Sequence, residues 1–384
     1  MDELPKLTPE DMDGPPLLGR HDRQRVTANN KADRINNDTS MSEPAKIDAV
    51  AAVRGWFSSD TSVVDAYMAD TLSASQAAAK LATPIDEAYS TANHGAALWE
   101  AERSARTQRK YHAPEKALEM WGPEEDFPAP DDATKALPNA EMSLWELWYA
   151  VLHVSRRIPW DDDARQEKLA DLVRTLKARP DPPLPERVTT ALRRNWIWKT
   201  GTLWSELIML GPSVAESWND CCGCGAGWTA VEQRAWVNVN AFLARLTGSG
   251  TAEFPMQGVG ALYEATEDKL KARSQYSNAP VSVRLSVYMR VASVWAIFAG
   301  GRIYEEISRE DDDGVVDGED VPLEPRWRKF PWKRGDDITE ARWTFWHRMV
   351  RHLSEKEELQ QEARDMAARA ARLMVSIQQG RAAE

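Results

Sequence analysis

The residues in this chain with the clearest potential for chemistry are three neighbouring cysteines, Cys221, Cys222 and Cys224. Thiolates are soft metal ligands and a C-x-x-C pair can close a ring, so a metal or redox site is one interpretation. A closed zinc site needs four ligands, and none of the chain's six histidines lies near this loop in the sequence. We therefore favour a glycine-rich loop with incidental thiols, and predict neither a metal nor a cofactor.

The segment Arg309–Asp320 is acidic and carries aspartate and glycine at offsets that fit a calcium-binding EF-hand loop. However, Arg309 stands where the first carboxylate ligand belongs, and Asp320 replaces the bidentate glutamate that closes such a loop. We interpret this segment as a solvated acidic loop. His347 and His352 are five positions apart, so they do not share a helical face as a pair of metal ligands would.

Motifs of common enzymes are missing from the sequence. It has no G-x-S-x-G, no G-x-x-x-x-G-K-[ST] and no H-E-x-x-H, the signatures of α/β-hydrolases, P-loop proteins and zinc proteases. Gly258-Val259-Gly260 lacks the third glycine of a dinucleotide-binding turn. Without a recognisable catalytic set, the sequence leaves enzyme activity open and inclines against it.

Polar side chains embedded in apolar helices are the remaining candidates for a functional site. They lie beside bulky aromatic residues or around the most apolar helix: Trp236, Asn238, Asn240, Arg245, Arg290, Trp295 and Arg302. A buried Arg or Asn must be paired, because burial without a partner costs several kcal/mol. We favour a structural network that fixes the register of the helices. The alternative is the polar lining of a small-molecule pocket between helices.

The elements that must position these side chains are helices, because apolar residues recur at helical spacing along most of the chain. No stretch of strict alternation is bounded by hairpin turn residues, so we predict an all-α fold. Ten of the seventeen tryptophans fall between Trp121 and Trp236, on amphipathic segments that build a core. The predicted helices lie at about 45–57, 60–72, 84–110, 140–158, 162–176, 187–210, 229–247, 256–272 and 281–308, and the stretch at 338–378 is predicted as one long helix or two.

We predict four regions along the chain. Residues 1–43 contain no aromatic residue and are expected to be disordered, because they cannot bury enough apolar surface to offset the entropy of ordering. A small N-terminal helical unit follows at 44–110, and a linker rich in proline and acidic residues at 111–139. Residues 140–384 form the main multi-helix globular domain with a long C-terminal helix.

The C-terminal stretch carries apolar residues at alternating steps of four and three, as in a heptad pattern: Leu359, Ala363, Met366, Ala370, Leu373 and Ile377. The run is too short to establish a coiled coil. We favour docking of this stretch on the chain's own core. The alternative is a seam between two copies, which implies a homo-oligomer.

The acidic balance of the chain restricts its partners. Sixty acidic against forty-eight basic residues give a net charge of −12, which disfavours binding to nucleic acid and to anionic membranes. The longest apolar stretch, Val291–Ala299, is about half of the roughly 20 residues that a membrane-spanning helix needs. The N-terminus lacks the basic start and apolar stretch of a signal peptide, so we expect a cytoplasmic protein.

Four helical segments carry a likeness to known sequences. In chain order they are Trp145–Val173, Trp236–Leu246, Ala292–Tyr304 and Arg342–Trp346. Together they resemble a fungal family of uncharacterised proteins, domain of unknown function 3632. The resemblance implies a helical body of fungal origin. It assigns no activity, substrate, cofactor or catalytic residue.

Two functional hypotheses follow from these features. The preferred one is a non-enzymatic soluble helical protein that presents an aromatic-rich face to another protein. The alternative is a cofactor-independent enzyme or small-molecule carrier with an inter-helix pocket lined by Trp, Asn and Arg. Arginine beside aromatic rings suits an anionic or π-rich metabolite, which is the physical motive for the alternative.

Overall fold

The computed structural model describes residues 20–56, 60–267, 279–306 and 338–380. Over these residues the regular secondary structure is helical, which confirms the predicted all-α fold. The α-helices are α1 (Arg20–Asn37), α2 (Glu43–Arg54), α3 (Ser62–Met68), α4 (Ala74–Ser90), α5 (Ala96–Arg109), α6 (Pro114–Trp121), α7 (Asp132–Lys135), α8 (Ala140–Arg156), α9 (Asp163–Lys177), α10 (Leu210–Ser217), α11 (Ala230–Gly248), α12 (Pro255–Thr266), α13 (Val281–Glu305), α14 (Glu340–Ser354) and α15 (Gln361–Gln378).

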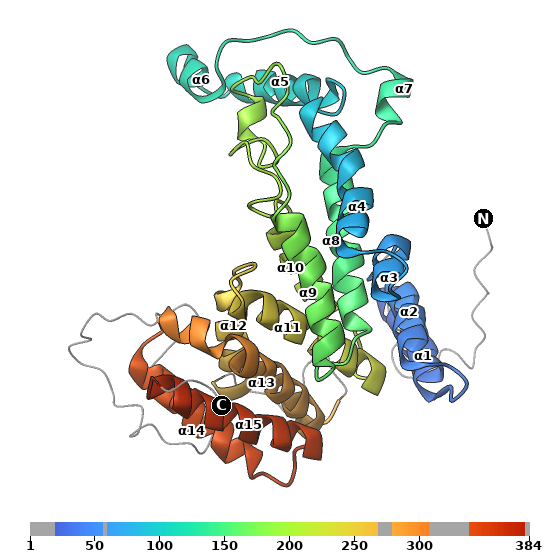
Figure 1. The fold of residues 1–384 in the computed structure, drawn as a ribbon, viewed down its shortest axis with the longest axis vertical. Coiled ribbons are helices and arrows are strands. Elements are labelled where there is room, and N and C mark those ends of the chain that lie inside the picture. Colours follow the sequence, from blue (N-terminus) through green and yellow to red (C-terminus); the bar gives the residue numbers. More distant parts are fainter. Residues whose placement is uncertain (1–19, 57–59, 268–278, 307–337, 381–384) are drawn as a thin grey trace, which may run out of the picture.

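The molecule is elongated, and its two ends are built from different parts of the chain (Figure 1). Helices α4 and α8 run along the long axis, and α5, α6 and α7 lie at one end. At the other end α13 packs against α11, α12 and α15, and α14 packs against α15. Helices α1, α2 and α3 lie along one flank.

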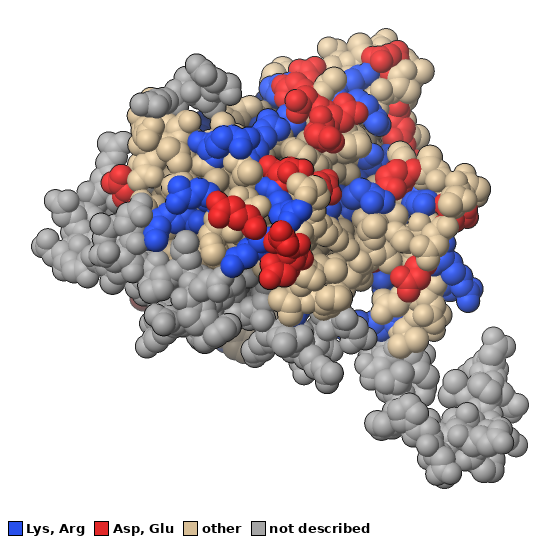
Figure 2. Space-filling view, turned by 90° about the horizontal axis from the view of Figure 1, so that it is seen from below, with Lys and Arg blue, Asp and Glu red and all other residues tan. Residues whose placement is uncertain are grey.

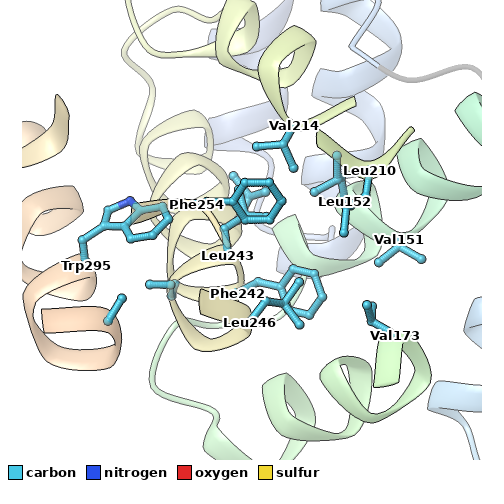
Figure 3. Close-up of a cluster of buried hydrophobic side chains, with 14 of the residues drawn as sticks. Val151, Leu152, Val173, Leu210, Val214, Phe242, Leu243, Leu246, Phe254 and Trp295 are labelled. Carbon is cyan, nitrogen blue, oxygen red and sulfur yellow. The ribbon is translucent and has the colours of Figure 1, made fainter. Parts of the chain in front are cut away.

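The largest hydrophobic core is centred on α11, which is buried on nearly all sides. Figure 3 shows Phe242 and Leu246 of α11 turned towards Val151 of α8 and Val173 of α9, while Trp295 of α13 lies on the opposite side of α11. The start of α11 is fixed by a capping box in which Thr229 and Glu232 each bond to the other's backbone N–H. A helix that is buried on nearly all sides and capped in this way forms the centre of a helical core.

Among the described residues, one helix, α13, is long and apolar enough to cross a membrane. In the fold, 67% of its most apolar window is buried by the rest of the chain. One buried helix of this kind is weak evidence for a membrane span, because the central helix of a packed core has the same composition.

The start of the chain differs from the prediction of disorder over residues 1–43. Residues 20–37 of this region form α1, so the prediction is wrong there, and residues 1–19 lie outside the described part. Ala32 and Ile35 of α1 pack with Ile47 and Val50 of α2 in a small separate cluster. A polar sequence can therefore order when a few small apolar side chains find a neighbouring helix to pack on.

The predicted helix at 187–210 is also wrong. This region forms turns and a short 3-10 helix at Leu192–Arg194 before α10 begins. The carboxylate of Asp181 accepts the backbone N–H groups of Leu203 and Trp204 at 2.7 and 2.6 Å, which competes with helical bonding. Leu207 and Met209 adopt positive φ angles of 47° and 70°, which a right-handed helix excludes.

Two other helices have different limits from those predicted. The helix expected at 84–110 is two helices, because α4 begins at Ala74 behind a capping box formed by Ser73 and Gln76, and contains Pro84 in its interior. Ala92, Asn93 and His94 then take positive φ angles and separate α4 from α5. The stretch at 338–378, predicted as one long helix or two, is two helices, α14 and α15, so the single long C-terminal helix is not formed.

The expected linker at 111–139 contains the short helices α6 and α7 in an otherwise extended segment (Figure 1). The division into domains at this linker stays a prediction. The hydrophobic core, however, is continuous across it, because Val64 and Tyr89 belong to the same buried cluster as Leu144 and Val173. The two sides of the linker thus share one core.

Candidate functional site

The fully buried tryptophans show how this sequence joins its helices. Six tryptophans are among the largest fully buried side chains of the described residues: Trp148, Trp198, Trp204, Trp295, Trp343 and Trp346. Each donates its indole N–H across the fold, for example Trp148 to the carbonyl of Ile208 at 2.8 Å and Trp198 to that of Tyr89 at 3.1 Å. A buried indole that finds an acceptor on another segment contributes both apolar area and a fixed orientation.

The first group of predicted site residues lies where α11 crosses α13. The Nε1–H of Trp295 donates to Oδ1 of Asn240 at 2.8 Å, and the amide nitrogen of Asn240 donates to the carbonyl of Trp236 one turn earlier at 2.9 Å. Asn240 is fully buried, so both ends of its amide are used inside the core. Asn238 donates instead to the carbonyl of Arg156 at the end of α8, at 2.9 Å.

A second group is centred on Arg290, which has an exposed fraction of 3%. Its guanidinium donates to Oε1 of Gln233 at 2.6 Å and to Oε2 of Glu362 at 3.0 Å. Through these bonds Arg290 of α13 is joined to both α11 and α15. A buried charge held by a carboxylate and an amide fixes the register of the helices it bridges.

The remaining two predicted residues lie elsewhere. Arg245 bonds to the carboxylate of Asp163 and places its guanidinium over the ring of Phe298, 3.7 Å from the centroid. Arg302 is exposed and pairs with Glu305 on the same helix at 2.8 Å. The seven candidates therefore do not converge on one cavity. Most of them hold neighbouring helices together, and Arg302 lies at the surface.

A further buried polar cluster, in which one carboxylate accepts three hydrogen bonds, lies between the end of α12 and α14. The sequence did not single it out. Arg342 donates to both carboxylate oxygens of Glu267 at 2.9 and 3.2 Å, and Trp346 donates its indole N–H to the same carboxylate at 2.5 Å. All three side chains are buried. The four-residue spacing of Arg342 and Trp346 puts them on one helical face, but nothing in the sequence indicates Glu267 as their partner.

His153 joins α8 to the N-terminal helices. Its Nε2 lies 2.7 Å from the carboxylate of Asp48 on α2, and the ring is 4% exposed. Burial lowers the pKa of His153 below its usual value, against the raising effect of Asp48. Burial alone raises the pKa of Asp48, but the bond from His153 and the charge of Arg157 bring it below the usual value. At neutral pH the pair is thus a neutral imidazole on an ionised carboxylate.

The cysteines lie in a compact loop between a 3-10 turn at 218–220 and α11. Cys222 is buried, Cys221 is partly buried and Cys224 is exposed, and all three are free thiols. Burial raises the pKa of Cys221 to about 12 and that of Cys222 well above its usual value. Among the described residues no three His, Cys, Asp or Glu side chains form a group that could hold a metal. The EF-hand-like segment Arg309–Asp320 lies outside the described residues.

An exposed aromatic surface lies at the end of the molecule that carries α5 and α6 (Figure 1). Tyr111 is 77% exposed, Leu118 56% and Trp196 49%. Trp121 links the two segments, because its ring lies 5.1 Å from that of His112 and 4.7 Å from the guanidinium of Arg194. We call Tyr111, His112, Leu118, Arg194 and Trp196 the α5–α6 surface.

Basic residues lie close to the exposed Trp196 along the chain. Arg193, Arg194 and Lys199 flank Trp196 and are exposed. None of the three forms a salt bridge with any residue that the structure describes. Arg194 instead donates to the carbonyl of Met120 at 2.7 Å. The sequence shows this group as Arg193-Arg194-Asn195-Trp196, but helical periodicity alone placed it inside a predicted helix.

The structure is that of an all-α protein whose core helices are joined by hydrogen bonds from buried tryptophan and arginine side chains. Its exposed aromatic residues, Tyr111 and Trp196, lie at one end. Residues 148–349, just over half of the chain, match a family described as protein of unknown function (DUF3632). The chain belongs to this family, as the resemblance of its helical segments indicated. No curated protein and no solved structure matches the chain.

Proposed function

We propose that this protein is a non-enzymatic helical protein that binds another protein through the α5–α6 surface. The observation that carries the proposal is the exposure of Tyr111, Leu118 and Trp196, on two segments that Trp121 connects through His112 and Arg194. Tyrosine and tryptophan are the residues most enriched at the energetic centres of protein interfaces. Most other large apolar side chains of the described chain are buried.

The charges around this surface favour an acidic partner segment with apolar side chains. Arg193, Arg194 and Lys199 are available for carboxylates, while Trp196 and Tyr111 offer flat apolar area. Complementary charge at the rim of an interface steers association and selects between partners. The net charge of −12 on the whole chain makes a nucleic-acid partner the weaker choice.

The alternative function, a carrier or enzyme with an inter-helix pocket, has less support. Its proposed lining residues Asn240, Trp295 and Arg290 direct their polar atoms at one another or at neighbouring helices. A ligand that used these groups would have to replace bonds that hold the core. The docking of α15 on α13 and α14 likewise leaves less of its apolar face for a second copy of the chain.

The proposal places the protein in a reducing compartment, the cytoplasm, and in a fungal cell. The chain has only three cysteines, all within one short loop, so it lacks the disulfide framework that is common in small extracellular domains. The fungal source rests on the resemblance of the four helical segments.

The test uses the full chain purified from its own cells by a mild affinity step and analysed by native mass spectrometry. We expect a stoichiometric protein partner, which is then produced separately and titrated against the purified chain. Replacing Tyr111→Ser and Trp196→Ser together should weaken that binding about tenfold or more, because both side chains leave the interface. The melting temperature should stay near that of the unmodified chain, since both residues are exposed.

The matched control is Met256→Ser, which removes an apolar side chain that is 61% exposed at the start of α12, far from α5 and α6. This variant should bind the partner normally. Equal binding by the Tyr111 and Trp196 double variant would contradict the proposed surface. A co-purifying small molecule without a protein partner would favour the carrier function.

A further inference from the structure

The loop Cys221–Ala226, here called the thiol loop, has a backbone turn that brings the main chains of Cys221 and Cys224 close together. The N–H of Cys224 donates to the carbonyl of Cys221 at 3.0 Å, which closes a four-residue turn. Gly223 occupies its third position with φ of +92°, as in a type II turn. Such a turn holds its first and fourth Cα atoms within about 7 Å, and disulfides join Cα atoms about 4.4–6.8 Å apart.

The rest of the loop holds this turn in place. The N–H of Gly225 donates to the carbonyl of Asn219 at 2.8 Å, and that of Gly223 to the carbonyl of Ala226 at 2.9 Å. A side chain at Gly223 would meet the ring of Trp228 at 2.8 Å, so the turn also needs glycine at this position. Because the backbone is already ordered, closing a bond between its ends costs little further entropy.

The three thiols of the loop have distinct environments. Cys222 is 4% exposed and belongs to the main hydrophobic core. Cys224 is exposed and open to solutes, and Cys221 lies between these extremes. Burial raises the pKa of Cys221, and the charge of the nearby Cys224 raises it further. The accessible pair at the two ends of the turn is therefore Cys221 and Cys224.

We propose that Cys221 and Cys224 form a reversible disulfide, with a low-molecular-weight disulfide such as oxidised glutathione as the oxidant. The thiolate of exposed Cys224 attacks the oxidant, forms a mixed disulfide and releases one small thiol. The thiolate of Cys221 then attacks the sulfur of Cys224, which releases the second small thiol. Two protein thiols are oxidised, one oxidant disulfide is reduced to two thiols, and the two protons pass to the released thiolates.

The closed disulfide would act on the contact between the thiol loop and the N-terminal helices. The indole N–H of Trp56, just after α2, donates to the carbonyl of Gly225 at 3.4 Å. Ala226 packs in the cluster that contains Ile47 and Val50 of α2. A covalent link across the turn restrains the surface on which α2 rests. Backbone amides of the thiol loop and of α2 should therefore exchange with solvent more slowly in the oxidised protein.

The experiment incubates the full chain with oxidised or reduced glutathione, traps free thiols by alkylation and maps the peptides by mass spectrometry. We expect a Cys221–Cys224 bond, seen as loss of two hydrogen atoms from that peptide, and its full reversal by dithiothreitol. The Cys222→Ala variant should close the same bond. Cys221→Ser should stop at a glutathione adduct on Cys224, and Cys224→Ser should resist oxidation.

Melting curves of the three variants establish that each is folded before it is oxidised. A wild-type chain that stops at the glutathione adduct on Cys224 would overturn the proposal, and so would a bond that includes Cys222. A Cys224→Ser variant that oxidises as fast as the wild type would also overturn it. None of these outcomes depends on the partner protein, so this inference and the proposed function fail separately.

Discussion

At the scale of single residues, this protein uses tryptophan to connect helices through hydrogen bonds as well as through apolar area. Trp295 bonds to Asn240, Trp346 to Glu267 and Trp204 to Asp86, each on a different segment of the chain. A buried donor that loses its acceptor carries the full cost of its desolvation, so these bonds contribute more to specificity than to net stability. The sequence indicates the donors by residue type and leaves the acceptors open, since they lie far away along the chain.

Replacing Asn240→Leu should lower the free energy of unfolding by about 1–3 kcal/mol, because the indole N–H of Trp295 is left in the core without its acceptor. Equilibrium urea denaturation measures the change. The double variant Asn240→Leu and Trp295→Phe removes the donor as well, so its loss should be smaller than the sum of the two single losses. Additive losses would show that the bond does not couple the two residues.

At the scale of helices, the sequence predicts position well where a helix is amphipathic or apolar and clearly capped. The helices expected near 140, 229 and 281 begin within a few residues of α8, α11 and α13. Prediction fails where a side chain from a distant part of the sequence accepts hydrogen bonds from backbone N–H groups, as Asp181 does from Leu203 and Trp204. The candidate site follows the same rule, because Asn240 and Arg290 could be recognised as buried polar residues but their partners could not.

The approach of α11 to α13 gives a prediction at this scale. A Cβ atom on Gly248 would lie 1.9 Å from the backbone carbonyl oxygen of Phe298, so the two helices must move apart to accept it. Gly248→Ala should therefore lower the free energy of unfolding by about 1–3 kcal/mol or more. Gly260→Ala is the matched control, because its Cβ meets nothing within 4 Å and alanine favours the helix. Thermal melting that ranks the two variants the other way would contradict this packing.

The contact of α2 with α8 should make stability depend on pH. The folded pKa of His153 is lowered by burial, so the proton binds more weakly in the folded than in the unfolded chain. The stabilising contribution is complete above the unfolded pKa of about 6.5 and is lost as pH falls through the lower folded value, by at most about 1.4 kcal/mol per pH unit. Urea denaturation between neutral and mildly acidic pH measures this slope.

Substitution of the histidine identifies its part in that slope. His153→Gln should flatten the dependence, because the group that titrates is gone. The exposed His94, replaced by asparagine as a control that tolerates its positive φ of 56°, should leave the slope unchanged. A slope of the same size in the His153 variant would assign the pH dependence to other groups.

At the scale of the whole molecule, charge is dispersed on the face seen in Figure 2, while the exposed aromatic residues are localised at one end. Figure 2 shows basic and acidic side chains intermingled over the face seen from below, with no large area of one sign among the coloured residues. Exposed Tyr111 and Trp196 lie at the end formed by α5 and α6. A face on which both signs are mixed lacks the single-sign field that draws in a polyanion, and the localised aromatic residues are the feature on which the proposed docking surface rests.

The continuity of the core across the segment 111–139 leads to a prediction about the whole fold. Tyr89 and Ile85 of α4 are buried in the same cluster as Leu144 of α8 and Val173 of α9. A protease site inserted after Ala129, which is exposed in an extended stretch, should be cut without separating the two pieces. The helices on either side of the cut would lose their largest buried surfaces if they came apart.

Size-exclusion chromatography of the cut protein should therefore give one particle at the elution volume of the uncut chain. The same sample should divide into two species in concentrated urea, which verifies the cut. Two separate folded species without denaturant would instead establish the N-terminal helices as an independent domain.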